Sequence, residues 1–197
     1  LVVVAGCMFI GAAAGLIGVF AFLRKQSLIG DALAHAALPG VCVAFLLTGT
    51  KEPFVILAGA VVSCWLGALA VESLTRYTRC KADSALGMVL SLFFAVGILL
   101  LTHIQKSGDA AQAGLDKFLF GQAAGLLQRD VYVFSGIAVL LCMVVVVAHK
   151  ELKAVTFDPE FAQAIGLPRR LMELLIATLI VLAVAIGLQA VGVVLMA

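Results

Sequence analysis

Asp31 and His35 are the side chains of this sequence best suited to carry chemistry. They stand four residues apart in SLIGDALAHAALPGVCVAFLL, a stretch that is otherwise almost entirely apolar. On a helix this spacing places both side chains on one face, about one turn apart. A carboxylate and an imidazole together suit a borderline divalent cation such as zinc, manganese or iron(II). The pair therefore predicts a metal-handling site.

A proline follows one helical turn after His35 and sharpens this prediction. Pro39 has no N–H, so the carbonyl oxygen of His35 loses its usual helical partner and is free to bind an ion, a water or a neighbouring helix. Gly30 and Gly40 lie on either side of the pair, where small residues permit close helix packing.

Structural roles also account for both residues. Asp31 lies near the expected start of its helix, where a carboxylate favours the positive end of the helix dipole. Ser27 could cap the same end, and His35 could hydrogen-bond a backbone carbonyl. Spacing alone leaves the metal-handling and structural interpretations open.

The composition requires a membrane around these residues. Of the 197 residues, 64% are hydrophobic and only 12% are charged, with a mean hydropathy of +1.21. Soluble chains carry about 25% charged residues, and a soluble fold of this size could not keep so much apolar surface from water. A net charge of +2 gives no indication of a nucleic-acid partner.

Apolar runs of spanning length define the expected helices, since a transmembrane helix needs about 20 such residues. They cover 1–23, 28–48, 54–74, 85–104, 131–149 and 172–188, with a further span starting near 190. The predicted fold is all-α, a polytopic transmembrane bundle of about six to seven spans. We expect one transmembrane domain over 1–197, truncated at both ends. Small residues in the first span, Gly11, Gly15 and Gly18, predict close helix approach.

Basic residues set the orientation, because short cytoplasmic loops are enriched in Lys and Arg. Alternating the loops collects nine of them on one side: Arg24, Lys25, Arg76, Arg79, Lys81, Lys150, Lys153, Arg169 and Arg170. The other side receives only Lys51, Lys106, Lys117 and Arg129. This predicts an exoplasmic segment 105–130 and a cytoplasmic loop 150–171.

That loop contains TFDPEFAQAIGLPRR, which predicts a short helix. Asp158 and Pro159 form a typical helix start, and Gly166 ends the stretch. Its apolar side collects Phe161, Ala164 and Ile165. A brief cytoplasmic helix between two spans suits docking to a soluble partner, and a helix lying in the membrane interface is the alternative.

The remaining polar and sulfur-containing residues give weaker signals. His103, His149 and Gln189 lie in or at the ends of spans, and a pathway role stays open for each. The five cysteines form no CxxC pair and are expected to be packing residues. The sequence has no GxxxxGK[ST], HExxH or GxSxG motif, so neither ATP binding by a phosphate loop nor the commonest membrane-hydrolase chemistry is indicated.

Four stretches in order resemble the permease subunits of bacterial ABC transporters for zinc, manganese and iron, the ABC-3 family. They are GLIGVFAFLRKQSLIGDALAHAALPGVCVAFLLTG, LDKFLFGQ, FDPEFAQAIGLP and LQAVGVVLMA, and together they cover essentially the whole chain. The resemblance implies a multi-pass permease of the bacterial cytoplasmic membrane with no enzymatic activity and no permanently bound cofactor. The divalent metal ion would be its transported substrate.

The resemblance also implies partners and site residues. The partners would be a cytoplasmic ATP-binding subunit that hydrolyses ATP, an extracytoplasmic metal-binding protein and a second permease subunit, identical or not. Asp31 and His35 would contact the metal, and LDKFLFGQ would lie toward the outer side. Segment 158–167 would be the coupling helix that contacts the ATPase, through Asp158, Glu160, Phe161, Ala162 and Gly166.

Three other functions compete with metal import driven by ATP. The first is an ABC permease for a different cargo, such as a metal chelate or vitamin. The second is a secondary cation transporter that needs no ATPase. The third is a membrane-embedded metalloenzyme, for which the sequence offers no convincing further ligand or base. The choice among manganese, iron and zinc is open at the level of ligand chemistry.

Overall fold

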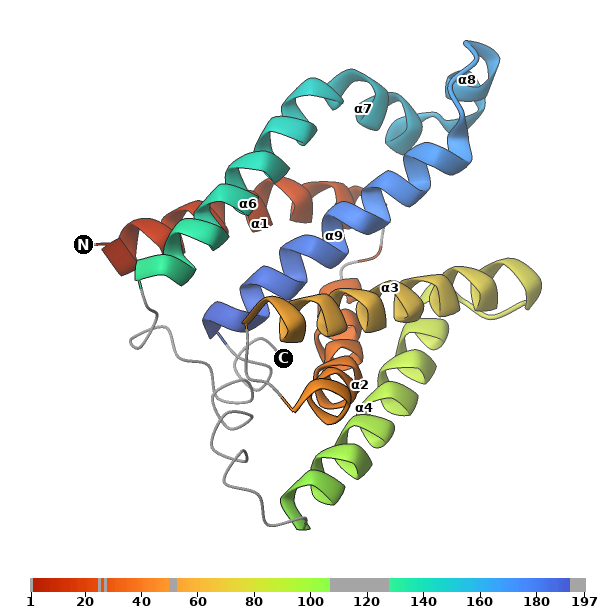
Figure 1. Cartoon of the computed structure of the whole chain (residues 1–197). Coiled ribbons are helices and arrows are strands. Elements are labelled where there is room, and N and C mark those ends of the chain that lie inside the picture. Colours follow the sequence, from red (N-terminus) through yellow and green to blue (C-terminus); the bar gives the residue numbers. More distant parts are fainter. Residues whose placement is uncertain (1, 25, 27, 50–52, 107–127, 192–197) are drawn as a thin grey trace. The chain divides into compact units, whose positions relative to one another are not determined.

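The computed structural model describes the chain apart from residues 1, 25, 27, 50–52, 107–127 and 192–197. Within the described part the secondary structure is helical (Figure 1). In chain order the helices are α1 (Val2–Leu23), α2 (Ile29–Thr48), α3 (Pro53–Tyr77), α4 (Ala82–Lys106), α6 (Gln128–Val147), α7 (His149–Phe157), α8 (Pro159–Ala164) and α9 (Arg169–Val191). A helix satisfies its backbone hydrogen bonds internally, as a bilayer demands. The predicted all-α fold is confirmed.

In the described part of the chain, five helices are long and apolar enough to cross a membrane. They cover Gly6–Leu23, Ile29–Thr48, Phe54–Tyr77, Ala82–Lys106 and Arg170–Leu188, and they coincide with five of the predicted spans. The predicted span 131–149 differs, because the chain bends by 67° between Tyr132–Val147 and His149–Phe157. The two pieces pass the same test of length and composition only as one broken span.

Two expectations fall wholly or partly on residues outside the described part. LDKFLFGQ lies entirely outside it. Helix α9 continues without a break to Val191, and most of the further span expected near 190 lies beyond that point.

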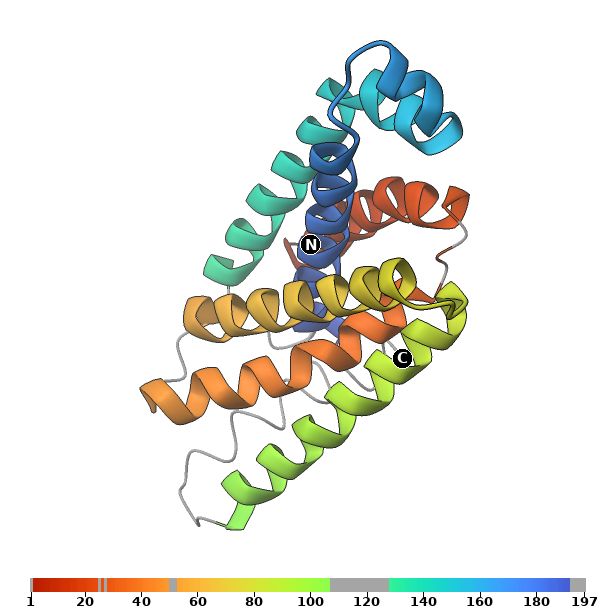
Figure 2. The same ribbon diagram turned by 90° about the vertical axis from the view of Figure 1, so that its right-hand side faces the viewer.

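The chain divides into two compact units, one of which carries the Asp31–His35 pair. This unit comprises residues 28–125 and 184–197. Within it α2 packs against both α3 and α4, which also contact each other. Figure 2 shows α2, in orange, running between α3 and α4. Helix α2 is therefore the central helix of this group.

The other unit comprises residues 1–27 and 126–183, so the division falls inside α9. Helix α1 packs along α6, and α7 contacts α1, α6 and α8. Each long helix buries one stripe at helical spacing: Ile10, Ala13, Ile17 and Ala21 on α1, and Phe134, Ala138, Leu141 and Val145 on α6. A single domain over 1–197 stays a prediction.

Against the rest of the described residues, the glycines of α1 do not make the close approach that we predicted. A Cβ added to Gly11, Gly15 or Gly18 would meet no atom within 4 Å. Gly30 of α2 is equally open. The sequence shows where small residues recur along a helix. It does not show which face of that helix packs against a neighbouring helix.

Candidate metal-ion site

Helix α2 contains a proline and still runs unbroken from Ile29 to Thr48. Its N-cap is Leu28, which makes no side-chain capping bond, and the predicted cap Ser27 lies outside the described residues. At the other end Gly49 adopts a left-handed φ of 61° and donates its N–H to the carbonyl of Phe45. Gly is favoured at such a helix end because it has no Cβ to clash.

The structure brings Asp31 and His35 together on α2. Oδ1 of Asp31 lies 3.3 Å from Nε2 of His35, with side-chain exposures of 37% and 16% respectively. Two ligands bound to one zinc ion at its usual tetrahedral geometry stand about 3.3–3.4 Å apart. This separation is therefore compatible with both atoms binding one cation.

Asp31 and His35 each have a buried polar side-chain atom that forms no hydrogen bond within the described residues. Oδ1 of Asp31 and Nδ1 of His35 are buried, and within the described residues neither has a hydrogen-bond partner. The approach of Oδ1 to Nε2 is thus a short polar contact whose geometry is not that of a hydrogen bond. Most buried polar atoms in folded proteins have a partner, so these two atoms remain available to a ligand within the described part of the chain.

Helix α3 fixes α2 from one side through small residues and side-chain donors. A Cβ on Gly40 would lie 2.2 Å from the carbonyl oxygen of Gly59, so the two backbones touch. The Ser63 hydroxyl donates to the carbonyl of Ala36 at 2.6 Å. The Cys64 thiol donates to the carbonyl of Leu33 at 3.1 Å. The predicted packing role of Gly40 is confirmed.

Helix α4 holds α2 from another side. A Cβ on Gly97 would lie 2.6 Å from Cδ2 of Leu38, and the Cys42 thiol is 3.9 Å from the Gly97 carbonyl. One turn earlier, the rings of His35 and Phe94 pack edge-to-face with centroids 4.9 Å apart and an interplanar angle of 76°. The face of α2 that carries His35 therefore meets α4.

The other candidate residues do not extend the pair. Among the described residues no three His, Cys, Asp or Glu side chains cluster as a metal site would require. His103 is exposed near the end of α4. His149 begins α7, and its ring packs against that of Phe20 with centroids 6.5 Å apart. Gln189 belongs to α9, but its side chain is outside the described part.

The short helix predicted in the loop 150–171 is present as α8. The Asp158 carboxylate caps it by accepting from the N–H of Phe161 at 2.9 Å, and Pro159 occupies the first turn. The chain then turns at Gly166, whose φ is +84°. Ala162 is buried, whereas Phe161 is 56% exposed. The start and the end of this helix thus follow the predicted pattern.

Helix α7 was missed by sequence reasoning. We read 150–171 as a loop with one short helix, yet His149–Phe157 forms a second one. Its signal is the spacing of Leu152 and Val155, which are both buried in a run rich in polar residues.

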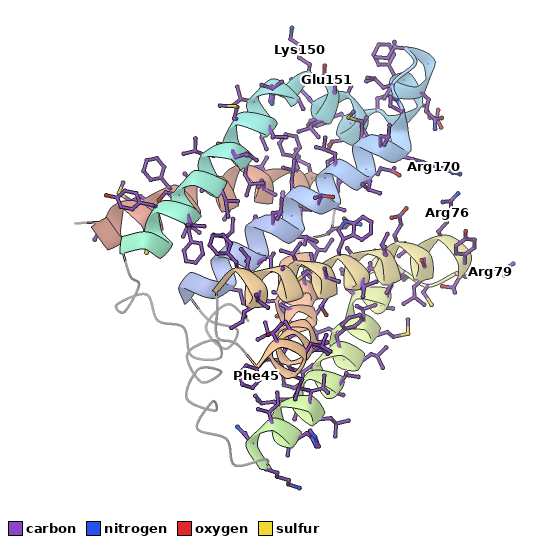
Figure 3. All side chains as sticks on the ribbon, viewed as in Figure 1. Phe45, Arg76, Arg79, Lys150, Glu151 and Arg170 are labelled. Atoms are coloured by element: carbon purple, nitrogen blue, oxygen red, sulfur yellow. The ribbon has the colours of Figure 1, made fainter. Side chains whose placement is uncertain are left out.

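The basic residues at the ends of these helices are exposed. Arg76 and Arg79 project from the end of α3 and the turn after it, and Lys150 and Arg170 extend from the first turns of α7 and α9 (Figure 3). The guanidinium of Arg76 lies 5.8 Å from the centre of the Tyr77 ring. This placement agrees with the positions expected of residues that flank membrane spans.

The sequence matches the model of the ABC 3 transport family (ABC-3) over residues 1–197. The chain belongs to the ABC-3 family. It is a multi-pass membrane protein of this family, with the helices described above as its candidate spans.

Two relatives of this chain are named as membrane proteins of metal transport systems. The chain is 52% identical over 195 residues to the manganese transport system membrane protein MntC of Bacillus subtilis, covering 99% of this chain and 45% of that protein. It is 50% identical over 194 residues to the zinc transport system membrane protein TroC of Treponema pallidum, covering 98% of this chain and 65% of that protein. The chain thus spans about half to two thirds of the length of these relatives.

A solved structure shares the fold of this ABC-3 protein. PsaBC from Streptococcus pneumoniae, determined in complex with a Fab, matches with a TM-score of 0.80 and 29% sequence identity. The match covers 98% of this chain and 66% of that chain. It supports the helical architecture over nearly the whole sequence.

Proposed function

We propose that this chain forms a large part of the membrane permease subunit of an ATP-driven importer. The importer would carry manganese, iron or zinc across the bacterial cytoplasmic membrane. Membership of the ABC-3 family and the manganese and zinc transport names of its relatives support this proposal. ATP hydrolysis would take place in a separate cytoplasmic subunit, and the ion would arrive from an extracytoplasmic metal-binding protein.

The observation that carries the proposal is the 3.3 Å approach of Asp31 Oδ1 to His35 Nε2. The pair lies on the central helix of its unit, inside a segment of spanning length. Ionisable residues in such a segment are expensive to keep in a bilayer and typically line an ion pathway. Asp31 and His35 would bind the metal ion as transported substrate.

Two ligands from one chain suit a transient site. Conduction requires binding that is strong enough to admit the ion and weak enough to release it. A second permease subunit would supply a matching pair, and water would complete the shell. Carboxylate and imidazole accept manganese, iron and zinc alike, so the ligand types alone leave the choice of metal to the rest of the assembly.

The cytoplasmic helix α8 would couple the permease to the ATPase. Glu160 and Phe161 are exposed and would make direct contacts. Asp158 caps the helix, Ala162 is buried beneath it, and Gly166 turns the chain after it. These three residues would hold Glu160 and Phe161 in a fixed position for contact with the ATPase.

Metal uptake by the full-length transporter tests the proposal. Asp31→Ala and His35→Ala should each reduce manganese or zinc uptake by at least about tenfold at matched expression, the range found when supporting groups at metal sites are lost. Gln105→Ala is the control, because Gln105 is an exposed polar residue near the end of the neighbouring helix α4. Unimpaired uptake in both Asp31→Ala and His35→Ala would exclude the pair from the pathway.

The same preparation separates the competing functions. Co-purification of an ATP-binding subunit, lost when Phe161 is replaced by Asp, supports ATP-driven transport over a secondary transporter. Competition of uptake by free divalent ions, but not by their chelates, supports a bare cation as the cargo.

A further inference from the structure

Phe94 of α4 is the aromatic neighbour of the candidate metal ligand His35. The two rings pack edge-to-face with centroids 4.9 Å apart, near the short end of the range for aromatic pairs. Phe94 is 40% exposed, so its ring is not held on all sides by the protein core. Among the described residues, its ring contact is with the imidazole of His35.

Among the described residues, no carboxylate or backbone carbonyl orients His35 through its second ring nitrogen. A metal-binding histidine generally donates its second ring N–H to a carboxylate, a backbone carbonyl or water. Nδ1 of His35 is buried and has no hydrogen-bond partner in the described part of the chain. Since Nε2 faces Asp31 at 3.3 Å, Nδ1 is the atom at which an orienting bond would be expected. The contact that the structure shows for the imidazole ring is instead the edge-to-face packing of Phe94.

The contact between the rings is fixed by the helices that carry them. Gly97 lies three residues after Phe94 and Leu38 three residues after His35, so each pair shares one helix face. A Cβ on Gly97 would lie 2.6 Å from Cδ2 and 3.0 Å from Cβ of Leu38. This close approach, one turn from the rings, sets the register of α4 on α2 and places Phe94 against the imidazole.

We propose that Phe94 is a positioning residue, which holds the His35 imidazole in the orientation that lets Nε2 and Asp31 Oδ1 bind the same ion. The inference rests on the proposed metal-binding role of Asp31 and His35. Phe94 itself need not touch the metal.

Cobalt(II) titration of the full-length permease pair in detergent tests this role, because the absorbance of bound cobalt reports both affinity and ligand geometry. Phe94→Leu keeps an apolar side chain but removes the ring, whereas Phe94→Tyr keeps the ring. Phe93→Leu is the matched control, since the adjacent residue points about 100° away around the helix. Phe94→Met serves as a second ring-free variant if Phe94→Leu does not fold.

The expected result is cobalt binding about tenfold weaker in the ring-free variants, with an altered absorbance band. Phe94→Tyr and Phe93→Leu should bind cobalt as the unaltered protein does. Equal affinity and the same band in a folded ring-free variant would overturn the positioning role. An equal loss of cobalt affinity in Phe93→Leu would also overturn the positioning role, because a general change in helix packing would then explain the loss in both variants.

A third comparison keeps this inference distinct from the proposed function. His35→Ala should abolish the cobalt band. If the unaltered protein gave no band, or His35→Ala retained it, the metal role of the pair would fail and the role of Phe94 with it. If His35→Ala lost the band while both ring-free variants kept it, only the role of Phe94 would fail.

Discussion

Gly40 of α2 and Gly59 of α3 touch through their backbones. A Cβ on Gly40 would lie 2.2 Å from the Gly59 carbonyl oxygen, and a Cβ on Gly59 would lie 2.6 Å from the Gly40 carbonyl oxygen. Small residues are the usual means of bringing membrane helices this close. The contact lies little more than one turn beyond His35 and fixes the helix that carries the candidate ligands.

Replacing Gly40 by Ala should destabilise the packing of α2 on α3. The added methyl group would overlap a backbone carbonyl, which cannot move aside like a flexible side chain, so we expect a loss of about 1–3 kcal/mol. A lower melting temperature of the purified full-length permease would report it. Gly30→Ala, on the same helix, is the control because its Cβ would meet nothing within 4 Å. Indistinguishable melting of the two variants would contradict the contact.

Replacing Gly97 by Ala should impair metal uptake by displacing Phe94. The new Cβ would press on Leu38, including its Cβ at 3.0 Å, so α4 must shift relative to α2. Gly87→Ala lies on the same helix in open space and controls for the gain in helix propensity, about 1 kcal/mol. We expect reduced uptake only in Gly97→Ala. Equal uptake by both variants at matched expression would argue against the proposed register.

Replacing Asp158 by Ala should loosen α8 and weaken the association with the ATPase. The carboxylate caps the helix through the Phe161 N–H, and loss of such a cap costs about 1 kcal/mol. Faster amide exchange over 160–165 would show the loosening, and lower recovery of the ATP-binding subunit would show the functional effect. Asp158→Asn retains a capping oxygen and should behave like the unaltered protein. Unchanged exchange in Asp158→Ala would refute the capping role.

The spans could be predicted from the sequence because each depends only on a local run of apolar residues. The same holds for α8, whose start at Asp158 and turn at Gly166 are encoded in a few adjacent residues. The bend of 67° before α7 could not be predicted in this way. No proline or glycine marks it, since the residues around it read VVVVAHKEL.

The surroundings of the candidate site were beyond sequence reasoning for a different reason. The spacing of Asp31 and His35 predicted that they share a face, and the distance of 3.3 Å agrees. The contact of Phe94 with His35 depends on the register between two helices that are far apart in the sequence. That register is set by contacts such as Leu38 on Gly97, and neither residue type signals it alone.

Manganese(II) bound to the full-length permease pair offers the most direct test that Asp31 and His35 hold one ion. Pulsed electron paramagnetic resonance detects nitrogen nuclei coordinated to manganese, so it distinguishes an imidazole ligand from water and carboxylate. We expect a coordinated-nitrogen signal in the unaltered protein, its loss in His35→Gln, and a weakened affinity with the signal retained in Asp31→Asn. A nitrogen signal that persists in His35→Gln would contradict the assignment of the site.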